Sequence, residues 1–290
     1  MTLDECRQFF ADEVRFAANV SSPELVEAFS LVPREQFLGP GPWEIASPDV
    51  RGLSPLSAVQ VSYTSVDDPR HLYHNVMFAL DKAADINNGQ PSALARWIDA
   101  MHLRRGERAY HLGSGVGYYT AIIAEVVGPE GSVVGTEVEL ELVERAAKNL
   151  RAYPNVAVHA KDGATFDPGE CDAMLINAGV THPSPLWLDR LRDGGRLVVP
   201  LTMAATPTVG VGLMTKIVRQ GNSYLLEVLS PLAIYSCKGV RDPEREPLMK
   251  AVMATGGFLK VKSIRRDKHE RTETCVLHGG DVCLSSMALT

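Results

Sequence analysis

The sequence predicts an α/β fold with a mostly parallel sheet, an antiparallel hairpin at the edge of the sheet, and helices on both faces. Strand-like and helix-like segments alternate between residues 107 and 200, a pattern typical of a right-handed parallel βαβ sheet. A glycine-rich turn at residues 113–117 joins the first strand to its helix. Two further strand-like stretches, 208–219 and 223–231, flank Gln-Gly-Asn and predict the hairpin.

Composition bounds the possible functions. The chain has 290 residues, of which 45% are hydrophobic and 22% charged, values that favour a folded domain with appendages over a disordered chain. A formal net charge of −6 provides no general attraction for nucleic acid or anionic membranes, so neither is expected as a partner. No stretch has the pattern of a secretion signal or a membrane span, and five scattered cysteines favour reduced thiols. A cytoplasmic protein is expected.

The N-terminal region is predicted to contain helices followed by loops. Apolar side chains at helical spacing predict a helix at residues 3–19. Ser22 before a proline is typical of a helix start, and the second helix should run to about residue 31. The stretch 39–69 is rich in Pro, Gly and Ser and predicts loops and short extended pieces. Helical periodicity returns at residues 90–101.

The alternating region continues to the hairpin. The strands expected after the glycine turn are residues 132–136, 156–159, 172–177 and 196–200. The helices expected with them, and after the hairpin, are residues 140–152, 186–191 and 243–255. Gly194 and Gly195 should close the second of these helices. The tail from 258 to 286 alternates charged and apolar stretches without a clear period, and predicts no regular structure.

Three features follow consecutive strands of the parallel unit. In the glycine turn 113–117, missing Cβ atoms let a ligand approach the backbone, and the next helix offers free amides. Glu137 ends the next strand, where a carboxylate can accept both ribose hydroxyls of an adenosine ligand, and Asp162 beside Gly163 can meet an adenine amino group. Singly, these features are compatible with a tight turn, a helix N-terminal acid and a turn residue. Together at one sheet edge they predict an adenosine-binding crevice.

Several stretches between about residues 20 and 202 carry a family resemblance. They are residues 22–28, 32–37, 89–91, 113–118, 137, 162–163 and 172–200. In these stretches the chain resembles the protein-L-isoaspartate O-methyltransferase family, within the class I S-adenosylmethionine-dependent methyltransferases and their Rossmann-like sheet. Val-Pro-Arg at 32–34 and Gln-Pro at 90–91 are more specific to that family than the glycine turn.

The resemblance implies a seven-stranded sheet, S-adenosyl-L-methionine in the glycine crevice, S-adenosyl-L-homocysteine as product, and methyl transfer to a carboxylate of a peptide, protein or small acid. A carboxylate with a pKa of about 4 is ionised at neutral pH and needs no general base. The enzyme must align acceptor and methyl and exclude water. The residues expected around the donor are His111, Gly113, Ser114, Gly115, Gly117, Tyr118, Glu137, Val138, Asp162, Gly163 and Asn177.

The expected acceptor side departs from the family's pattern. Asn87-Asn88-Gly89 stands where the family has Thr-Ile-Ser, so a glycine replaces a serine hydroxyl. The asparagine amides can bind an acceptor or simply form a turn. His111 replaces a usually acidic residue and is expected to be a buried, hydrogen-bonded histidine. His182, after the fourth strand, is either a base for a hydroxyl or amine acceptor or an exposed loop residue. The candidate catalytic residues are Asn88, Gln90 and His182, and the candidate acceptor-binding residues are Tyr73, His74, Asn87 and Asn88.

Three regions are expected. Residues 1–80 should cover the acceptor side, residues 81–232 should form the donor-binding core, and residues 233–290 should cap the pocket or build a homodimer interface. The last region contains four residues of metal-ligand type, His269, Cys275, His278 and Cys283. Their spacing matches no paired zinc motif, and residues 275–278 alternate like a strand, so no metal is expected.

Three other functions are compatible with the sequence. An oxygen or nitrogen methyltransferase of a natural-product pathway would use His182 or His74 as base. An NAD-dependent oxidoreductase would carry Gly-x-Gly-x-x-Gly, but Tyr118 stands where its third glycine belongs. A noncatalytic binding protein would bind the methyl donor without turnover.

Overall fold

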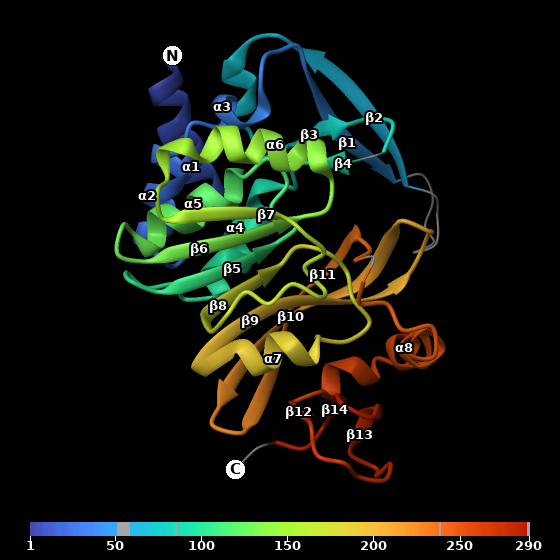
Figure 1. Ribbon diagram of the computed structural model, residues 1–290. Helices are drawn as coiled ribbons and strands as arrows, with labels where there is room; N and C mark the ends of the chain where they lie inside the picture. Colours follow the sequence, from blue (N-terminus) through green and yellow to red (C-terminus); the bar gives the residue numbers. More distant parts are fainter. Residues whose placement is uncertain (51–58, 85, 238, 289–290) are drawn as a thin grey trace.

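The computed structural model describes residues 1–50, 59–84, 86–237 and 239–288 (Figure 1). Its centre is a ten-stranded sheet in the order β13-β14-β12-β11-β10-β9-β8-β5-β6-β7. The five strands from β9 to β7 run parallel, and the five pairings from β9 outward to β13 are antiparallel. The predicted α/β class is confirmed, and the antiparallel hairpin adjoins the parallel strands, which form one end of the sheet.

The strands alternate with the helices as expected. In chain order the strands of the large sheet are β5 (Arg108–Leu112), β6 (Ser132–Glu137), β7 (Val156–Ala160), β8 (Cys171–Ile176), β9 (Leu191–Ala204), β10 (Val209–Gln220), β11 (Ser223–Tyr235), β12 (Ser263–Arg265), β13 (Cys275–Leu277) and β14 (Cys283–Ser285). The predicted hairpin is β10–β11, paired over its whole length.

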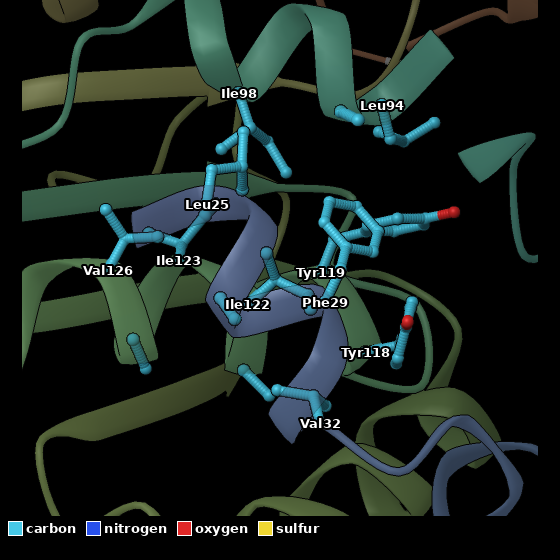
Figure 2. Close-up of a cluster of buried hydrophobic side chains, with 14 of the residues drawn as sticks. Leu25, Phe29, Val32, Leu94, Ile98, Tyr118, Tyr119, Ile122, Ile123 and Val126 are labelled. Atoms are coloured by element: carbon cyan, nitrogen blue, oxygen red, sulfur yellow. The ribbon is translucent and has the colours of Figure 1, made fainter. Parts of the chain in front are cut away.

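One face of the sheet is covered by helices that share a single hydrophobic cluster. They are α1 (Leu3–Ala18), α2 (Pro23–Leu31), α4 (Pro91–Ala100), α5 (Tyr118–Val127) and α6 (Leu140–Asn149), the last followed by the 3-10 turn η2 (Leu150–Ala152). Figure 2 shows Ile123 of α5 beside Leu25 of α2 and Ile98 of α4. The N-terminus of α5, which carries the glycine turn, is therefore fixed by two neighbouring helices.

The opposite face carries α7 (Pro185–Arg190), α8 (Arg245–Ala254) and the 3-10 turn η3 (Gly257–Lys260) over a second hydrophobic cluster. Trp187 of α7 is fully buried there and donates its indole N–H to the carbonyl of Gly163 at 3.0 Å. This bond ties the helix layer to the loop after β7. No described helix combines the length and apolar character that crossing a bilayer requires.

A small four-stranded sheet lies over one end of the large one (Figure 1). Its strands are β1 (Trp43–Val50), β2 (Val59–Val66), β3 (Met77–Asp81) and β4 (Ile86–Asn87). The helical segments beside them are α3 (Arg34–Leu38) and the 3-10 turn η1 (Pro69–Leu72). The expectation of loops and short extended pieces at 39–69 therefore underestimates β1 and β2, which pair with each other over eight residues. Trp43 and Ile45 pack against Leu72 and Phe78 in a separate small cluster, a long-range contact that local composition does not reveal.

Arg34, in the Val-Pro-Arg segment, holds this sheet to the helices. Its side chain is fully buried, and its guanidinium donates to the carbonyls of Leu72 (2.7 Å), His74 (3.0 Å) and Val76 (2.9 Å). The guanidinium also lies 5.2 Å from the ring centroid of Phe78 in β3. Backbone carbonyls and aromatic faces thus replace the water that a buried cation loses.

Two expectations about the far side of the sheet are corrected. Gly194 and Gly195 do not close a helix, because β9 begins at Leu191, directly after α7. Leu191 pairs with Cys171 and Arg196 with Ala173, so residues 192–195 form a bulge in which Gly194 has a φ of 72°. The hairpin is not the edge of the sheet either. Three short strands of the tail continue it beyond β11, and the implied seven strands become ten.

Candidate functional site

A cleft of about 380 Å³ opens at the carboxyl ends of β5, β6 and β7, where open α/β sheets bind ligands. It is bordered by the glycine turn, by the β3–β4 hairpin and by the end of β11. Its lining residues are Leu80, Ala84, Ile86, Asn87, Leu112, Gly113, Gly115, Thr136, Glu137, Val138, Glu139, Leu142, Lys161, Asp162, Gly163, Asn177, Thr208, Tyr235, Ser236 and Cys237.

The glycine turn meets the cleft through two of its three glycines. Gly113 and Gly115 line it with φ values of 76° and 54°, which side chains other than glycine rarely adopt. A Cβ on Gly115 would meet no atom within 4 Å, so the backbone there faces open space that a ligand can fill. Gly117 does not line the cleft but has a structural role. It caps α5 with a φ of 91°, and a Cβ there would lie 2.7 Å from Leu150 Cδ1.

Glu137, at the end of β6, is 9% exposed, and its carboxylate organises the adjoining backbone. Oε2 accepts the N–H of Gly115 at 2.9 Å. Oε1 accepts those of Val138 at 2.7 Å and Glu139 at 3.2 Å. A carboxylate has about four acceptor positions, so these three bonds leave room for one further donor. Glu137 therefore joins the glycine turn to its own strand and retains one position for a ligand hydroxyl.

Asp162 lies at the neighbouring strand end and is held by its own loop. Its Oδ1 accepts the N–H of Ala164 at 2.9 Å. The loop is tight, because a Cβ on Gly163 would lie 2.4 Å from Leu112 Cδ1. Gly239, after β11, also approaches closely, and a Cβ there would be 2.6 Å from Asp162 Oδ2. Gly163 thus lets the loop pack onto β5, and Gly239 lets backbone pack directly beside the Asp162 carboxylate.

Two asparagines lie on the remaining border of the cleft. Asn177 follows β8, and its Nδ2 lies 3.5 Å from the carbonyl oxygen of Gly113. Asn87 ends β4, and its Oδ1 accepts the N–H of Gly89 at 2.9 Å. The Oδ1 of Asn87 is therefore engaged, and its Nδ2 donors are left for a ligand.

Four expected donor contacts do not line the cleft. Tyr118 points into the helix layer, where its ring makes edge contacts with Phe29 of α2 (Figure 2) and with Phe37 of α3. His111 is buried under the turn, with Nδ1 2.9 Å from Thr120 Oγ1. Burial lowers the pKa of His111 to about 4, so the ring is neutral at pH 7. The other two are the buried side chain of Ser114 and the capping Gly117.

Most of the candidate catalytic and acceptor-binding residues also lie outside the cleft. Buried Asn88 accepts the N–H of Phe78 at 2.7 Å through Oδ1, and exposed Gln90 only precedes α4. Tyr73 is buried, and its hydroxyl bonds to Glu35, which is a structural role. The side chain of His74 stacks with His71. Of these candidates only Asn87 lines the cleft.

His182 lies behind the cleft rather than in it. Its Nδ1 is 2.9 Å from Thr181 Oγ1, and the histidine does not line the cavity. Burial, and then the positive charge of Arg245, lower the pKa of His182 to about 4. A base for the acceptor at this position is not supported, because the imidazole does not reach the cavity.

Sequence reasoning missed the residues that the hairpins contribute. Leu80 and Ile86 come from β3–β4, and Tyr235 and Ser236 from the end of β11. The second strand was expected to stop at Pro231, whereas β11 continues to Tyr235. Because β12 pairs with β11 only at residues 224 and 225, the missing N–H of Pro231 interrupts no pairing with β12. The continuous apolar run of residues 232–235, which ends in isoleucine and tyrosine, was the available signal.

Comparison with known proteins identifies the family of this chain. The family model described as protein-L-isoaspartate(D-aspartate) O-methyltransferase matches residues 60–225. The protein-L-isoaspartate O-methyltransferase of Ignicoccus hospitalis is 34% identical over 173 residues, covering 57% of this chain and 79% of the relative. The protein-L-isoaspartate O-methyltransferase 1 of Archaeoglobus fulgidus is 37% identical over 146 residues, covering 46% of this chain and 67% of the relative.

Solved structures agree on the fold. A protein-L-isoaspartate O-methyltransferase superposes with a TM-score of 0.62 at 18% identity, covering 90% of this chain and 72% of the other. A putative one from Plasmodium falciparum, in complex with S-adenosyl-L-homocysteine, gives a TM-score of 0.59 at 15% identity, covering 80% and 98%. The chain therefore belongs to the protein-L-isoaspartate(D-aspartate) O-methyltransferase family and is an S-adenosylmethionine-dependent methyltransferase.

Proposed function

We propose that this chain transfers a methyl group from S-adenosylmethionine to a carboxylate of an isoaspartyl residue in a peptide or protein. The observation that carries the proposal is the cleft itself, in which the glycine turn, Glu137 and Asp162 meet at the ends of three parallel strands. Relatives that match this chain are named for that acceptor.

The donor-holding roles follow from the chemistry of the lining. The backbone at Gly115 accommodates the amino-acid part of the donor, because no Cβ occupies the open space beside it, and Gly113 lines the same part of the cleft. Glu137 accepts a ribose hydroxyl at its remaining position, and Asp162 accepts the adenine amino group. When bound, the donor supplies a methyl group on a sulfonium, which a nucleophile can displace. Val138, Gly163 and Asn177 complete the lining around it.

Glu137 and Asp162 in the lining are engaged with backbone N–H groups around the expected donor, and the described lining offers no imidazole as a base for the acceptor. Cys237 lines it, but burial raises the pKa of this thiol, so it stays protonated at neutral pH. A hydroxyl or amine acceptor would need a base to remove its proton. A carboxylate acceptor is already ionised, so positioning is enough.

Asn87 and Ser236 are the polar groups that fit the positioning role. Both residues line the cleft. The hydroxyl of Ser236 is buried and has no hydrogen-bond partner among the described residues, and the Nδ2 group of Asn87 carries two further donors. Both groups can donate to an acceptor carboxylate, which gains strength because the acceptor is charged. They come from opposite borders of the cleft, so an acceptor held by both would be fixed in direction.

The test is a comparison of three peptides of one sequence, with isoaspartate, aspartate or asparagine at the same position, incubated with donor carrying a radiolabelled methyl. We expect label in a base-labile ester on the isoaspartyl peptide and at least about tenfold less on the others. Asp162→Asn should lower labelling, and Asp189→Asn, an exposed change on α7, should not. Equal labelling of all three peptides, or none of any, would contradict the proposed acceptor.

A further inference from the structure

The last strands bring together four side chains that the cleft does not use. One ligand-type atom from each of His269, Cys275, His278 and Cys283 lies within 4.8 Å of the other three. The expectation of no metal rested on their sequence spacing, and the fold overturns that argument. Cys275 lies on β13 and Cys283 on β14, which pair antiparallel. His278 follows β13, and His269 lies in the preceding loop.

The local hydrogen bonds orient the first histidine for coordination. His269 Nδ1 is 2.8 Å from the backbone carbonyl oxygen of Asp267, which makes Nδ1 the protonated nitrogen and leaves Nε2 as an electron-pair donor. Nε2 lies 3.5 Å from Cys275 Sγ. Two ligands at 2.3 Å and 2.0–2.1 Å from a tetrahedral zinc ion would be about 3.6 Å apart. The pair already has the separation that a zinc ion requires.

The other three side chains of the cluster are also placed so that they can bind a metal ion. The N–H of Thr272 donates to Cys275 Sγ at 3.3 Å, a bond that stabilises a thiolate. Cys283 is fully buried. His278 Nδ1 is buried without a hydrogen-bond partner, and its ring lies 5.0 Å from that of His269. An unsatisfied buried nitrogen costs free energy in a folded protein. Binding of a metal ion to this cluster would offset that cost.

We propose that His269, Cys275, His278 and Cys283 form a structural zinc site. Two thiolates and two imidazoles in a tetrahedron are a ligand set that zinc favours. Each thiol gives its proton to the solvent on binding, so the ion and its two thiolates are neutral together. Four protein ligands leave no open position, which makes the role structural rather than catalytic.

The position of the cluster explains what the ion would do. β12, β13 and β14 are three residues long each, too short to be stable by strand pairing alone. The turn between His278 and Cys283 also contacts the rest of the protein, because Arg245 donates to the carbonyl of Val282 at 3.0 Å and pairs with Asp242. The N–H of Asp242 in turn donates to Thr181 Oγ1. Zinc would therefore hold the tail against the loop that follows β8.

The experiment is metal analysis of full-length protein purified under reducing conditions without an affinity metal. We expect one zinc per chain by mass spectrometry. Exchange with Co²⁺ should give thiolate charge-transfer absorption and the intense visible bands of a tetrahedral site. Cys283→Ser and His278→Gln should lower the zinc content to less than half, and His278→Cys should retain it, since it keeps a ligand. The matched controls Cys6→Ser and His102→Gln, far from the cluster in sequence, should keep one zinc per chain.

Three results would overturn the proposal, and the first two do not depend on a variant folding correctly. The first is wild-type protein without zinc that also gives no cobalt bands when titrated with Co²⁺. The second is a Cys275–Cys283 disulfide in reduced, zinc-supplemented protein, detected by peptide mass mapping. Zinc retained in both Cys283→Ser and His278→Gln would likewise show that these four residues do not hold it.

Discussion

The cleft has two halves that are built in different ways. The donor half comes from residues 112–163, and short backbone bonds to Glu137 hold its turns together. The cover half comes from the β3–β4 hairpin and the end of β11, roughly 150 residues apart in the chain. Buried Arg34 fixes the first of these segments from a third part of the chain. Donor binding therefore rests on local geometry, and acceptor placement on long-range packing.

The largest effect should come from Arg34→Met, which attacks the cover half alone. It leaves the buried carbonyl of Leu72 and the part-buried carbonyls of His74 and Val76 without donors. A buried unsatisfied group costs about 1–3 kcal/mol, so the free energy of unfolding should fall by about 3 kcal/mol in urea titrations. Binding of S-adenosylhomocysteine by the protein that remains folded should stay within about threefold, because no donor contact is lost. A donor affinity lowered as strongly as the stability would show that the halves are coupled.

A second change tests His111, buried under the glycine turn, through the pH dependence of stability. The unfolded chain protonates His111 near pH 6.5, whereas burial lowers the folded pKa to about 4. Between these values the unfolded state binds more protons, so stability is complete above pH 6.5 and falls as pH falls, by up to about 3 kcal/mol. Unfolding midpoints measured from pH 7 to pH 4 should decline less steeply in His111→Asn. Exposed His159→Gln should keep the wild-type slope, and an unchanged slope in His111→Asn would refute the assignment.

The third change removes the carboxylate that joins the donor half. Glu137→Ala loses a charged hydrogen bond to the donor, worth about 1.5–3 kcal/mol, so calorimetry with S-adenosylhomocysteine should show about 10- to 100-fold weaker binding. Glu141→Ala, an exposed acid in the first turn of α6, is the matched control and should bind normally. Wild-type affinity in Glu137→Ala would place the donor elsewhere.

A smaller effect should separate the two halves kinetically. Asn87→Ala removes one hydrogen bond to the acceptor, worth about 1 kcal/mol, so KM for the isoaspartyl peptide should rise by about fivefold while the donor Kd is unchanged. Asn222→Ala, in the exposed β10–β11 turn, should alter neither value. A change in donor Kd with constant peptide KM would move Asn87 into the donor half.

The smallest effect is expected at His182, behind the cleft. His182→Ala should change kcat by less than about twofold, and the wild-type rate should show no step that follows a histidine between about pH 5.5 and pH 8, because a carboxylate acceptor needs no base. A tenfold loss of kcat together with a loss of the pH step would reinstate a histidine base.

Features held by local bonds could be predicted from the sequence, and features set by long-range packing could not. The glycine turn, Glu137 and Asp162 could be located from the sequence because each directly follows its own strand and makes local bonds. Tyr118, next to the turn, could not be oriented, because helices α2 and α5 decide which way its ring points. Pro231 was interpreted as a strand end because the sequence does not reveal that no strand pairs with the outer edge of β11 at that position in the described structure. His269 and Cys283 meet only through the pairing of β13 with β14.

The three tail strands also affect how the molecule behaves toward its own copies. Without them β11, a 13-residue strand, would present its first residues as an open edge, and long open edges template aggregation through unpaired backbone groups. With them the sheet ends in β13, only three residues long and followed by a turn of polar residues and glycines. A short terminal strand offers an incoming chain few hydrogen bonds. The tail therefore covers the beginning of the β11 edge, where Tyr224 and Leu225 pair with β12 and are not open to another chain.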